Sequence, residues 1–350
     1  MKILLFSRWN ATCGISMHAE LIGREWAKKH QITVLAPYLE TTTDWHHILI
    51  DNKDEDYVIR GYEQPKEKGG EGKISDIIFE DFDICVFEGG SHLLPIKTLI
   101  EIFPKIKAKK VYIWHDTDLK WVVEDFYKLD FSALCVFDER YKEMVSKKYP
   151  EEKIFILPYP CFPIIKADKN KLRKELDLEE DKIIFFSFGR QPLNEYEDYF
   201  WLTERLRKRY NIKYLIFRAF KEKEENFPQI DILEIRREAP PNEIIIKYLL
   251  AADIHLIPKR KDQKEIVVSS TVFQTMGTLT PIIFPDTRYV ELLEKEIVKY
   301  KDKKDLEEKV IRLIEDEEYR KEIIIAAEKY VKENSAEVIA EKFIELFKNL

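Results

Sequence analysis

The sequence has few of the residues from which cofactor and metal motifs are built. Only 10 of its 350 residues are glycine, and no G-x-G-x-x-G run is present, which excludes the usual nicotinamide dinucleotide fingerprint. The cysteines form no C-x-x-C pair, so neither a zinc site nor a disulfide framework is predicted; they are Cys13, Cys85, Cys135 and Cys161. No H-E-x-x-H pattern occurs either. We therefore expect no metal and no resident cofactor.

Long hydrophobic runs and excess positive charge are also missing. No apolar run approaches the roughly 20 residues that span a bilayer. The opening MKILLFSRW turns polar after its sixth residue, so it predicts a first strand instead of a signal peptide. The formal net charge of -7 argues against a general nucleic-acid-binding protein, because phosphates are neutralised by a basic face. A cytoplasmic location is expected.

The sequence does contain a regular alternation of apolar strand-like runs and amphipathic helical stretches, which is typical of βαβ units and a mostly parallel sheet. The composition, 45% hydrophobic and 35% charged, excludes a disordered chain, and its abundant Lys, Glu and Ile resemble proteins from hot environments. In the first half the predicted strands are Lys2–Ser7, Gln31–Pro37, Asp83–Gly89, Lys110–Asp116, Ala133–Asp138 and Ile154–Pro160, with helices at Met17–His30 and Arg140–Lys148. In the second half the predicted strands are Lys182–Gly189, Lys213–Ala219, Asp231–Ile235, Asp253–Pro258 and Thr280–Pro285, followed by a helical tail over Asp305–Leu350.

Two domains are expected, because 350 residues exceed what one hydrophobic core usually serves. Pro158, Pro160 and Pro163 favour an extended connector between them. We predict an α/β fold class with two Rossmann-like, doubly wound domains that face each other across a cleft. The predicted bounds are 1–160 and 161–330, with a last helix over 331–350.

Glycines and polar residues follow the strands of the first half, where parallel sheets bind their ligands. Gly14 follows the first strand, and His115 and Asp116 end the fourth. A histidine at such a strand end is either a structural hydrogen-bonding residue or part of a ligand site. His-Asp also suggests a metal phosphohydrolase, but further ligands at helical spacing are missing. The third strand ends in polar residues that suit a ligand: Glu88, Gly90, Ser91 and His92.

The second half contains a candidate anion site at a helix that is expected to open near Ser269–Thr271. Free backbone N–H groups and hydroxyls at a helix start can hold a diphosphate, although the same residues also form ordinary helix caps. Gly189 and Arg190 follow the first strand of this half, and a guanidinium suits phosphate oxygens. The basic loop that contains Lys259 and Lys264 is expected to assist.

Together these segments resemble the GT-B glycosyltransferases, most closely the family 4 group that uses nucleotide sugars. The similar segments are CGISMHAELIGREWAKKHQITVLAP, VYIWHDTD, FFSFGRQP, and LLAADIHLIPKR followed by VFQTMGTLTPIIFP. The resemblance implies that the N-terminal half takes the acceptor, that the C-terminal half takes the donor, and that the last helix crosses back to the first domain. It also implies that Gly14 lies near the donor phosphates, that His115 contacts the transferred sugar and that Arg190 binds the diphosphate.

Two departures from the family pattern are present. The family usually has a lysine shortly after the Gly-Arg pair, but this chain reads QPLNEYE over Gln191–Glu197. The family's pair of glutamates, separated by seven residues, is replaced by Ile266 and Gln274, with Glu265 one position away. Gln274 can still donate and accept hydrogen bonds at ribose hydroxyls, although the charge is lost.

These arguments predict one site with three groups of residues and no metal ligand. The catalytic residues are His115, Arg190 and Glu265. The donor-binding residues are Gly14, Asp116, Gly189, Lys259, Lys264, Ser269, Ser270, Thr271 and Gln274. The acceptor-side residues are Glu88, Gly90, Ser91 and His92.

The expected function is transfer of a hexose-like sugar from a nucleotide diphosphate-sugar to an unidentified acceptor, with retention and without a metal. A nucleotide-sugar epimerase on the same fold is one alternative, and a catalytically silent module that binds a sugar nucleotide or a partner is another. The expected partners are a nucleotide-sugar donor and a glycan, lipid-linked or small-molecule acceptor, and no nucleic acid.

The segment Pro95–Lys110 alternates apolar residues with five lysines. One interpretation is a patch that makes weak peripheral contact with anionic lipid at the inner face of the membrane. The other is a solvated helix face of a heavily charged protein. The sequence leaves both open.

Overall fold

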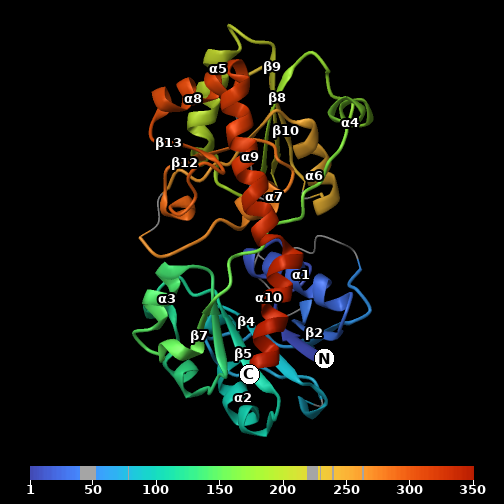
Figure 1. The fold of residues 1–350 in the computed structure, drawn as a ribbon, viewed down its shortest axis with the longest axis vertical. Helices are drawn as coiled ribbons and strands as arrows, with labels where there is room; N and C mark the ends of the chain where they lie inside the picture. Colours follow the sequence, from blue (N-terminus) through green and yellow to red (C-terminus); the bar gives the residue numbers. More distant parts are fainter. Residues whose placement is uncertain (40–52, 78, 219–227, 229, 239, 262–263) are drawn as a thin grey trace. The chain divides into compact units, whose positions relative to one another are not determined.

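The computed structural model describes residues 1–39, 53–77, 79–218, 228, 230–238, 240–261 and 264–350, which form two compact units (Figure 1). Unit 1 consists of Met1–Pro160, Glu265–Ser270 and Asn334–Leu350. Unit 2 consists of Cys161–Lys264 and Thr271–Glu333. Each unit has helices packed on a parallel sheet, so the predicted α/β class with two doubly wound sheets is confirmed.

Unit 1 is built on a seven-stranded parallel sheet in the order β3-β2-β1-β4-β5-β6-β7. Its strands are β1 Lys2–Phe6, β2 Gln31–Pro37, β3 Val58–Tyr62, β4 Ile84–Gly89, β5 Lys109–Trp114, β6 Ala133–Val136 and β7 Ile154–Ile156. The central strands form because their apolar runs are buried on both faces, as in β1, where Ile3 to Phe6 are fully buried. Strand β3 is not predicted from the sequence, since this edge strand buries only Gly61 and Tyr62.

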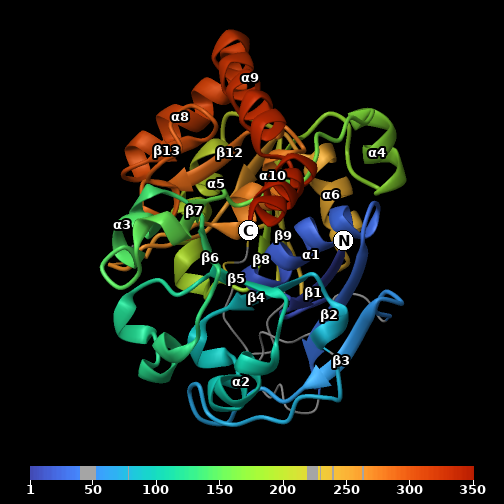
Figure 2. The same cartoon turned by 60° about the horizontal axis from the view of Figure 1, so that its bottom comes forward.

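The main helices of unit 1 are α1 Gly14–Ala27, α2 Ile96–Ile102, α3 Glu139–Val145 and α10 Ala336–Asn349. Helix α1 starts at Gly14 instead of near Met17, because the Cys13 sulfur caps it by accepting the Ser16 N–H at 3.4 Å. Figures 1 and 2 both show α10 beside α1, and the Trp26 indole donates to the Ala340 carbonyl at 3.1 Å. The implied return of the last helix to the first unit is therefore confirmed.

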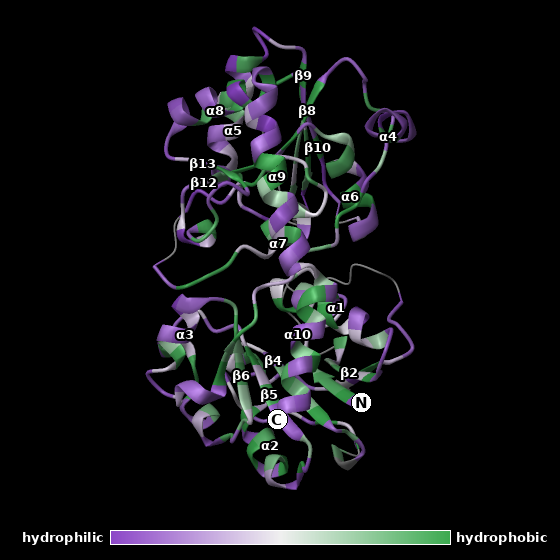
Figure 3. Cartoon of the chain, viewed as in Figure 1, coloured by the Kyte–Doolittle hydropathy of each residue, from purple (hydrophilic) through white to green (hydrophobic). Residues whose placement is uncertain are grey.

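Unit 2 is built on a six-stranded parallel sheet in the order β10-β9-β8-β11-β12-β13. Its strands are β8 Ile183–Gly189, β9 Ile212–Arg218, β10 Leu233–Arg236, β11 Ile254–Leu256, β12 Ile282–Pro285 and β13 Val298–Tyr300. Its helices include α4 Lys169–Glu175, α5 Glu197–Leu206, α6 Asn242–Ala251, α7 Ser270–Met276, α8 Lys303–Glu315 and α9 Glu317–Asn334. In Figure 3 the hydrophobic colour follows the strands, whereas α8 is largely hydrophilic. The sequence analysis missed β13, which has only three residues.

Several strands end before their predicted last residue. Strand β5 ends at Trp114, so His115 and Asp116 lie in the loop that follows it. Strand β7 ends at Ile156, just before the proline-rich connector, because proline lacks the N–H that a ladder needs. The predicted strand end at Ala219 lies outside the described residues. Within the described part of the chain, no helix combines the length and apolarity that crossing a membrane requires.

Candidate functional site

Both sheets have a topological switch point, where the strand order reverses and where open α/β sheets form a ligand crevice. In unit 1 it lies between β1 and β4, and in unit 2 between β8 and β11. The loops that follow these four strands carry most of the residues predicted from the sequence.

In unit 1 the ends of β4 and β5 bring Glu88 and His115 together, and α1 adds His18, which the sequence analysis did not select. Both histidines face one carboxylate oxygen: Glu88 Oε1 lies 2.9 Å from His115 Nε2 and 2.8 Å from His18 Nδ1. Glu88 and His18 are buried, and His115 is nearly so. The His18 ring packs against Phe137 and Tyr159.

Burial dominates the acid–base properties of this cluster. It lowers the pKa of His18 to about 3 and also lowers the pKa of His115, where the Glu88 carboxylate partly opposes the shift. Burial raises the pKa of Glu88, against the hydrogen bond from His115. Both imidazoles are therefore neutral near pH 7. The cluster holds His115 in place through a hydrogen bond to a carboxyl oxygen that is shielded from water.

The same three side chains are the one group within the described residues that has enough nearby ligand atoms for a metal ion, all within 4.8 Å of one another. Two ligand atoms about 2.05 Å from a tetrahedral zinc ion lie about 3.3 Å apart. The observed separations of 2.8 and 2.9 Å from the shared oxygen are shorter. The separation between His115 and Glu88 fits a hydrogen bond, whereas His18 Nδ1 makes none within the described residues. The expectation of no metal stays a prediction.

The predicted acceptor-side residues are held together by Asp116, which was predicted as a donor-binding residue. Its Oδ2 accepts the Ser91 N–H at 2.8 Å, and its Oδ1 lies 3.4 Å from His92 Nδ1. A Cβ at Gly90 would lie 2.8 Å from the His92 ring, so a larger residue there would displace that side chain. In this structure Asp116 fixes the loop after β4, and its own carboxylate is almost fully buried.

The segment Glu265–Ser270, which the sequence boundaries assign to the second domain, packs within unit 1. The Ile266 N–H donates to the Thr117 carbonyl at 3.1 Å, and the Glu265 carboxylate pairs with Lys120 at 2.7 Å. Ser270 lies against Gly14, where a Cβ would be 3.2 Å from the serine Oγ. The structure thus brings together Gly14 and Ser270, the first residue of α7.

In unit 2 the predicted residues Gly189 and Arg190 end β8, and Lys259 follows β11. Gly189 adopts a φ of +129, which non-glycine residues rarely do, and this conformation turns the chain sharply before Arg190. Lys259 is partly buried, and burial together with the Arg190 charge lowers its pKa to about 8, against the Glu195 carboxylate. Two cations therefore share the switch point of this sheet.

The remaining predicted residues of unit 2 are more dispersed. Gln274 on α7 donates to the Asn242 side chain at 2.8 Å, so its amide is already engaged. Thr271 lies in the first turn of α7, and its carbonyl accepts the Thr275 hydroxyl at 2.8 Å. Lys264 is exposed, and its carbonyl accepts a hydrogen bond from Arg288.

Three further polar residues near the candidate sites were not selected from the sequence. Arg8 follows β1, Glu195 lies near Lys259, and His18 lies on α1. Arg8 follows a predicted strand directly, as Arg190 does, and Glu195 lies in the segment after another, so position alone could have found them. His18 occupies a position on the buried face of a helix, where a sequence gives no sign that its partner is a carboxylate.

A cavity of about 660 Å³ lies at the amino-terminal ends of the unit 2 strands, next to the first residues of β8, β11 and β12. Its walls include Ile183, Asp253 and Pro281, together with Arg320 from α9. It is separate from the cluster that contains Arg190 and Lys259, because those residues follow the strands at their carboxyl ends.

No model of a known protein family matches the sequence. The structure is similar to that of Anabaena HepE in complex with UDP and glucose, at 11% identity, 100% coverage of both chains and a TM-score of 0.64. A glycosyltransferase from Rickettsia africae matches at 13% identity over 99% of this chain and 98% of that chain, with a TM-score of 0.69. Sucrose-phosphate synthase from Thermosynechococcus elongatus matches at 11% identity over 100% of this chain and 98% of that chain, with a TM-score of 0.66. The two parallel sheets and these full-length similarities show that the chain has the GT-B fold of glycosyltransferases.

Proposed function

We propose that this protein is a glycosyltransferase that moves a sugar from a nucleotide diphosphate-sugar to an acceptor. The observation that carries the proposal is the pair of cations, Arg190 and Lys259, at the switch point of the unit 2 sheet. It is supported by the fold, which is shared with a protein whose structure contains UDP and glucose.

The paired cations fit a diphosphate better than they fit a purely structural role. Partial burial and the neighbouring Arg190 guanidinium disfavour the protonated form of Lys259, and this is why its pKa is lowered. A diphosphate bound between them would reverse this effect and restore the charge. Lys259 also supplies an ammonium group to a site in which the family's usual lysine is missing. We infer that Lys259 takes over the role of that lysine.

The proposed chemistry depends on stabilising the departing diphosphate. Arg190 offers two parallel N–H groups to phosphate oxygens, and Lys259 offers a point charge. The N–H groups at the start of α7 are proposed to add dipolar stabilisation, in line with the sequence-based prediction for Ser269–Thr271. With these groups in place, the leaving group needs no metal ion.

His115 is proposed to contact the transferred sugar. Its Nε2 is engaged by the buried Glu88 carboxylate, so the ring is fixed and its other nitrogen is left as the acceptor. We propose retention of configuration and a family 4-like mechanism, in which no enzymic base has to be placed opposite the sugar.

The test is product analysis of the full chain with UDP-, GDP- and ADP-sugars, with and without candidate acceptors. A glycosylated product and free nucleoside diphosphate support the proposal. A changed sugar nucleotide formed without acceptor identifies an epimerase. Binding without any turnover identifies a silent sugar-nucleotide-binding module, and absence of binding at millimolar donor rejects the proposed donor site.

A further inference from the structure

Arg8 has a buried guanidinium with no anionic partner among the described residues. It follows β1 at the switch point of the unit 1 sheet, and only 6% of the residue is exposed. Its contacts are to neutral groups: Nη2 donates to Gln64 Oε1 at 3.2 Å, and Nη1 lies 3.9 Å from the Cys13 sulfur. Its Nε is buried and makes no hydrogen bond. A buried charge in this state is strongly unfavourable unless something else compensates it.

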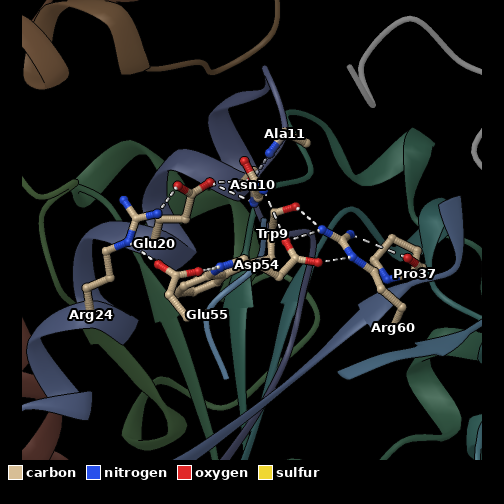
Figure 4. A network of polar contacts seen from close by, with 10 residues as sticks. Trp9, Asn10, Ala11, Glu20, Arg24, Pro37, Asp54, Glu55 and Arg60 are labelled. Atoms are coloured by element: carbon tan, nitrogen blue, oxygen red, sulfur yellow. Dashed lines mark hydrogen bonds and ion pairs between the residues drawn. The ribbon is translucent and has the colours of Figure 1, made fainter. Parts of the chain in front are cut away.

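Neighbouring arginines, unlike Arg8, have carboxylate partners. Figure 4 shows Arg24 between the carboxylates of Glu20 and Glu55, and Arg60 against Asp54. The same holds in unit 2, where the buried Arg173 pairs with Asp253 at 2.6 Å and donates to three backbone carbonyls. A missing carboxylate is therefore a feature of the Arg8 position and not of this protein's arginines in general.

The loop that carries Arg8 is fixed before any ligand arrives. Asn10 adopts a left-handed φ of 53, and its N–H donates to Glu20 Oε1 at 2.9 Å. The Ala11 N–H donates to the Ser16 hydroxyl at 2.9 Å. These bonds tie the loop to α1, and Trp9 is anchored by Glu55, as Figure 4 also shows. A pre-positioned cation of this kind is what an anion site requires.

The start of α1 adds a second source of positive potential beside Arg8. The helix has 14 residues, has no acidic residue in its first turn, and is capped by Cys13, the residue that Arg8 contacts. The N–H groups of Gly14 and Ile15 donate no hydrogen bond within the described residues. Unpaired N–H groups at a helix start attract anions.

We propose that Arg8, with Gln64 and the start of α1, binds an oxyanion of the acceptor, so that the acceptor is a phosphorylated or carboxylated molecule. The inference rests on the proposed function, in which the donor diphosphate is held by unit 2. Gln64 follows β3, so the guanidinium group of Arg8 reaches towards the β2–β3 side of the sheet, away from Glu88 and His115.

Strand spacing gives the expected size of such an acceptor. Arg8 follows β1 and His115 follows β5, and β4 lies between these two strands. Two strand intervals of about 4.8 Å place the two ends about 10 Å apart. That length accommodates one sugar ring with an anionic group at one end and the reacting hydroxyl near His115.

The test measures binding by titration calorimetry on the full chain, with inorganic phosphate as the probe. Saturating UDP is present, so that Arg190 and Lys259 are occupied. We expect phosphate to bind the wild-type protein, to bind Arg8→Met at least tenfold more weakly, and to bind Arg8→Lys with intermediate affinity because the fork is lost. The control variant is Arg60→Met with Asp54→Asn, which removes a neighbouring cation together with its partner and should leave phosphate binding unchanged. UDP affinity should be the same in all four proteins.

The other outcomes separate failure of this proposal from failure of the proposed function. Equal phosphate binding by wild type and Arg8→Met, or none by wild type, rejects the site. A parallel loss of UDP affinity in Arg8→Met assigns the oxyanion to the donor. Failure of UDP to bind the wild-type protein counts against the proposed function and leaves the phosphate comparison intact. If Arg8→Met does not fold, Gln64→Leu, which keeps the guanidinium, is expected to weaken phosphate binding by itself.

Discussion

Two arginines of unit 2, Arg190 and Arg260, differ in the charged groups beside them. Arg260 is held by Glu197 at 2.8 Å and by Asp198 at 3.2 Å, so its charge is satisfied within the protein. Arg190 instead lies beside a second cation, Lys259, whose pKa is lowered. The two arginines belong to the same unit and provide a matched comparison.

Replacing Arg190 with alanine should weaken nucleoside diphosphate binding about tenfold or more, because a charge-assisted hydrogen bond contributes roughly 1.5–3 kcal/mol. Arg260→Ala should leave the affinity within about twofold, since a satisfied surface ion pair contributes little. Titration calorimetry with UDP measures both. Equal affinities for wild type and Arg190→Ala would place Arg190 outside the site.

The lowered pKa of Lys259 predicts that the affinity for nucleoside diphosphate depends on pH. Its pKa in the folded protein is about 8, below the usual 10.5, so the ammonium is largely charged at pH 7 and loses its proton as the pH rises through 8. UDP affinity should therefore fall between pH 7 and pH 9. In Lys259→Arg the charge persists, and the affinity should stay nearly constant over this range. A wild-type affinity that is flat with pH contradicts the assignment.

The lowered pKa of the buried His18 predicts that the stability of the folded protein depends on pH. Its pKa is about 3 in the folded protein and near 6.5 in the unfolded chain, so below pH 6.5 only the unfolded form gains the proton. Folded stability is then lost as the pH falls. His18→Phe removes this effect. Its free energy of unfolding, taken relative to that of wild type, should therefore be about 2 kcal/mol higher at pH 5 than at pH 7. Urea unfolding at both pH values checks this, and an unchanged difference would show that His18 titrates normally.

The helices and strands that position the site follow from local sequence patterns to different extents. Long buried strands such as β1 and β8 were predictable, since their apolar runs are continuous. The edge strand β3 and the three-residue β13 were not, because partners distant in the sequence stabilise them more than their own residues do. The cap of α1 by Cys13 also lay beyond sequence reasoning, since thiols are uncommon caps.

The segment Pro95–Lys110 forms α2, a short 3-10 turn and the start of β5. Most of its apolar residues, among them Leu99 and Phe103, are buried in unit 1, and Ile100 and Ile102 are half-buried, whereas Lys97, Lys105, Lys107 and Lys109 are exposed. The exposed surface of this segment is therefore mainly basic, so we expect membrane contact through it to be electrostatic. The structure therefore favours the solvated-face interpretation.

We predict weak co-sedimentation with anionic vesicles at low salt and none at 150 mM salt, because charge attraction alone is screened. Changing Lys105, Lys107, Lys109 and Lys110 to glutamate should abolish the low-salt binding. Binding that persists at high salt, or that is indifferent to these changes, would contradict this account.

At the scale of the whole molecule, two sheets with reversed strand order each contribute polar groups at a switch point. The sequence predicted this architecture and placed Glu88, His115 and Arg190 at strand ends, because alternating patterns locate strand ends well. It could not predict that His18 faces Glu88, or that Arg8 lacks a carboxylate. Both facts depend on contacts between residues that are far apart in the sequence.

The account also predicts that turnover of a sugar nucleotide continues in excess EDTA, because cations and backbone N–H groups neutralise the leaving group. The measurement is the release of nucleoside diphosphate with and without chelator. Loss of turnover that manganese or magnesium restores would show that a metal takes part, with the His18–Glu88–His115 cluster as the first place to examine.

A crystal structure of the full chain with bound UDP tests the central claim most directly. We predict that the diphosphate lies at the carboxyl ends of β8 and β11, with its oxygens within hydrogen-bonding distance of Arg190 and Lys259. A diphosphate bound elsewhere in the protein, with both side chains still turned to protein neighbours, would contradict the proposed donor site.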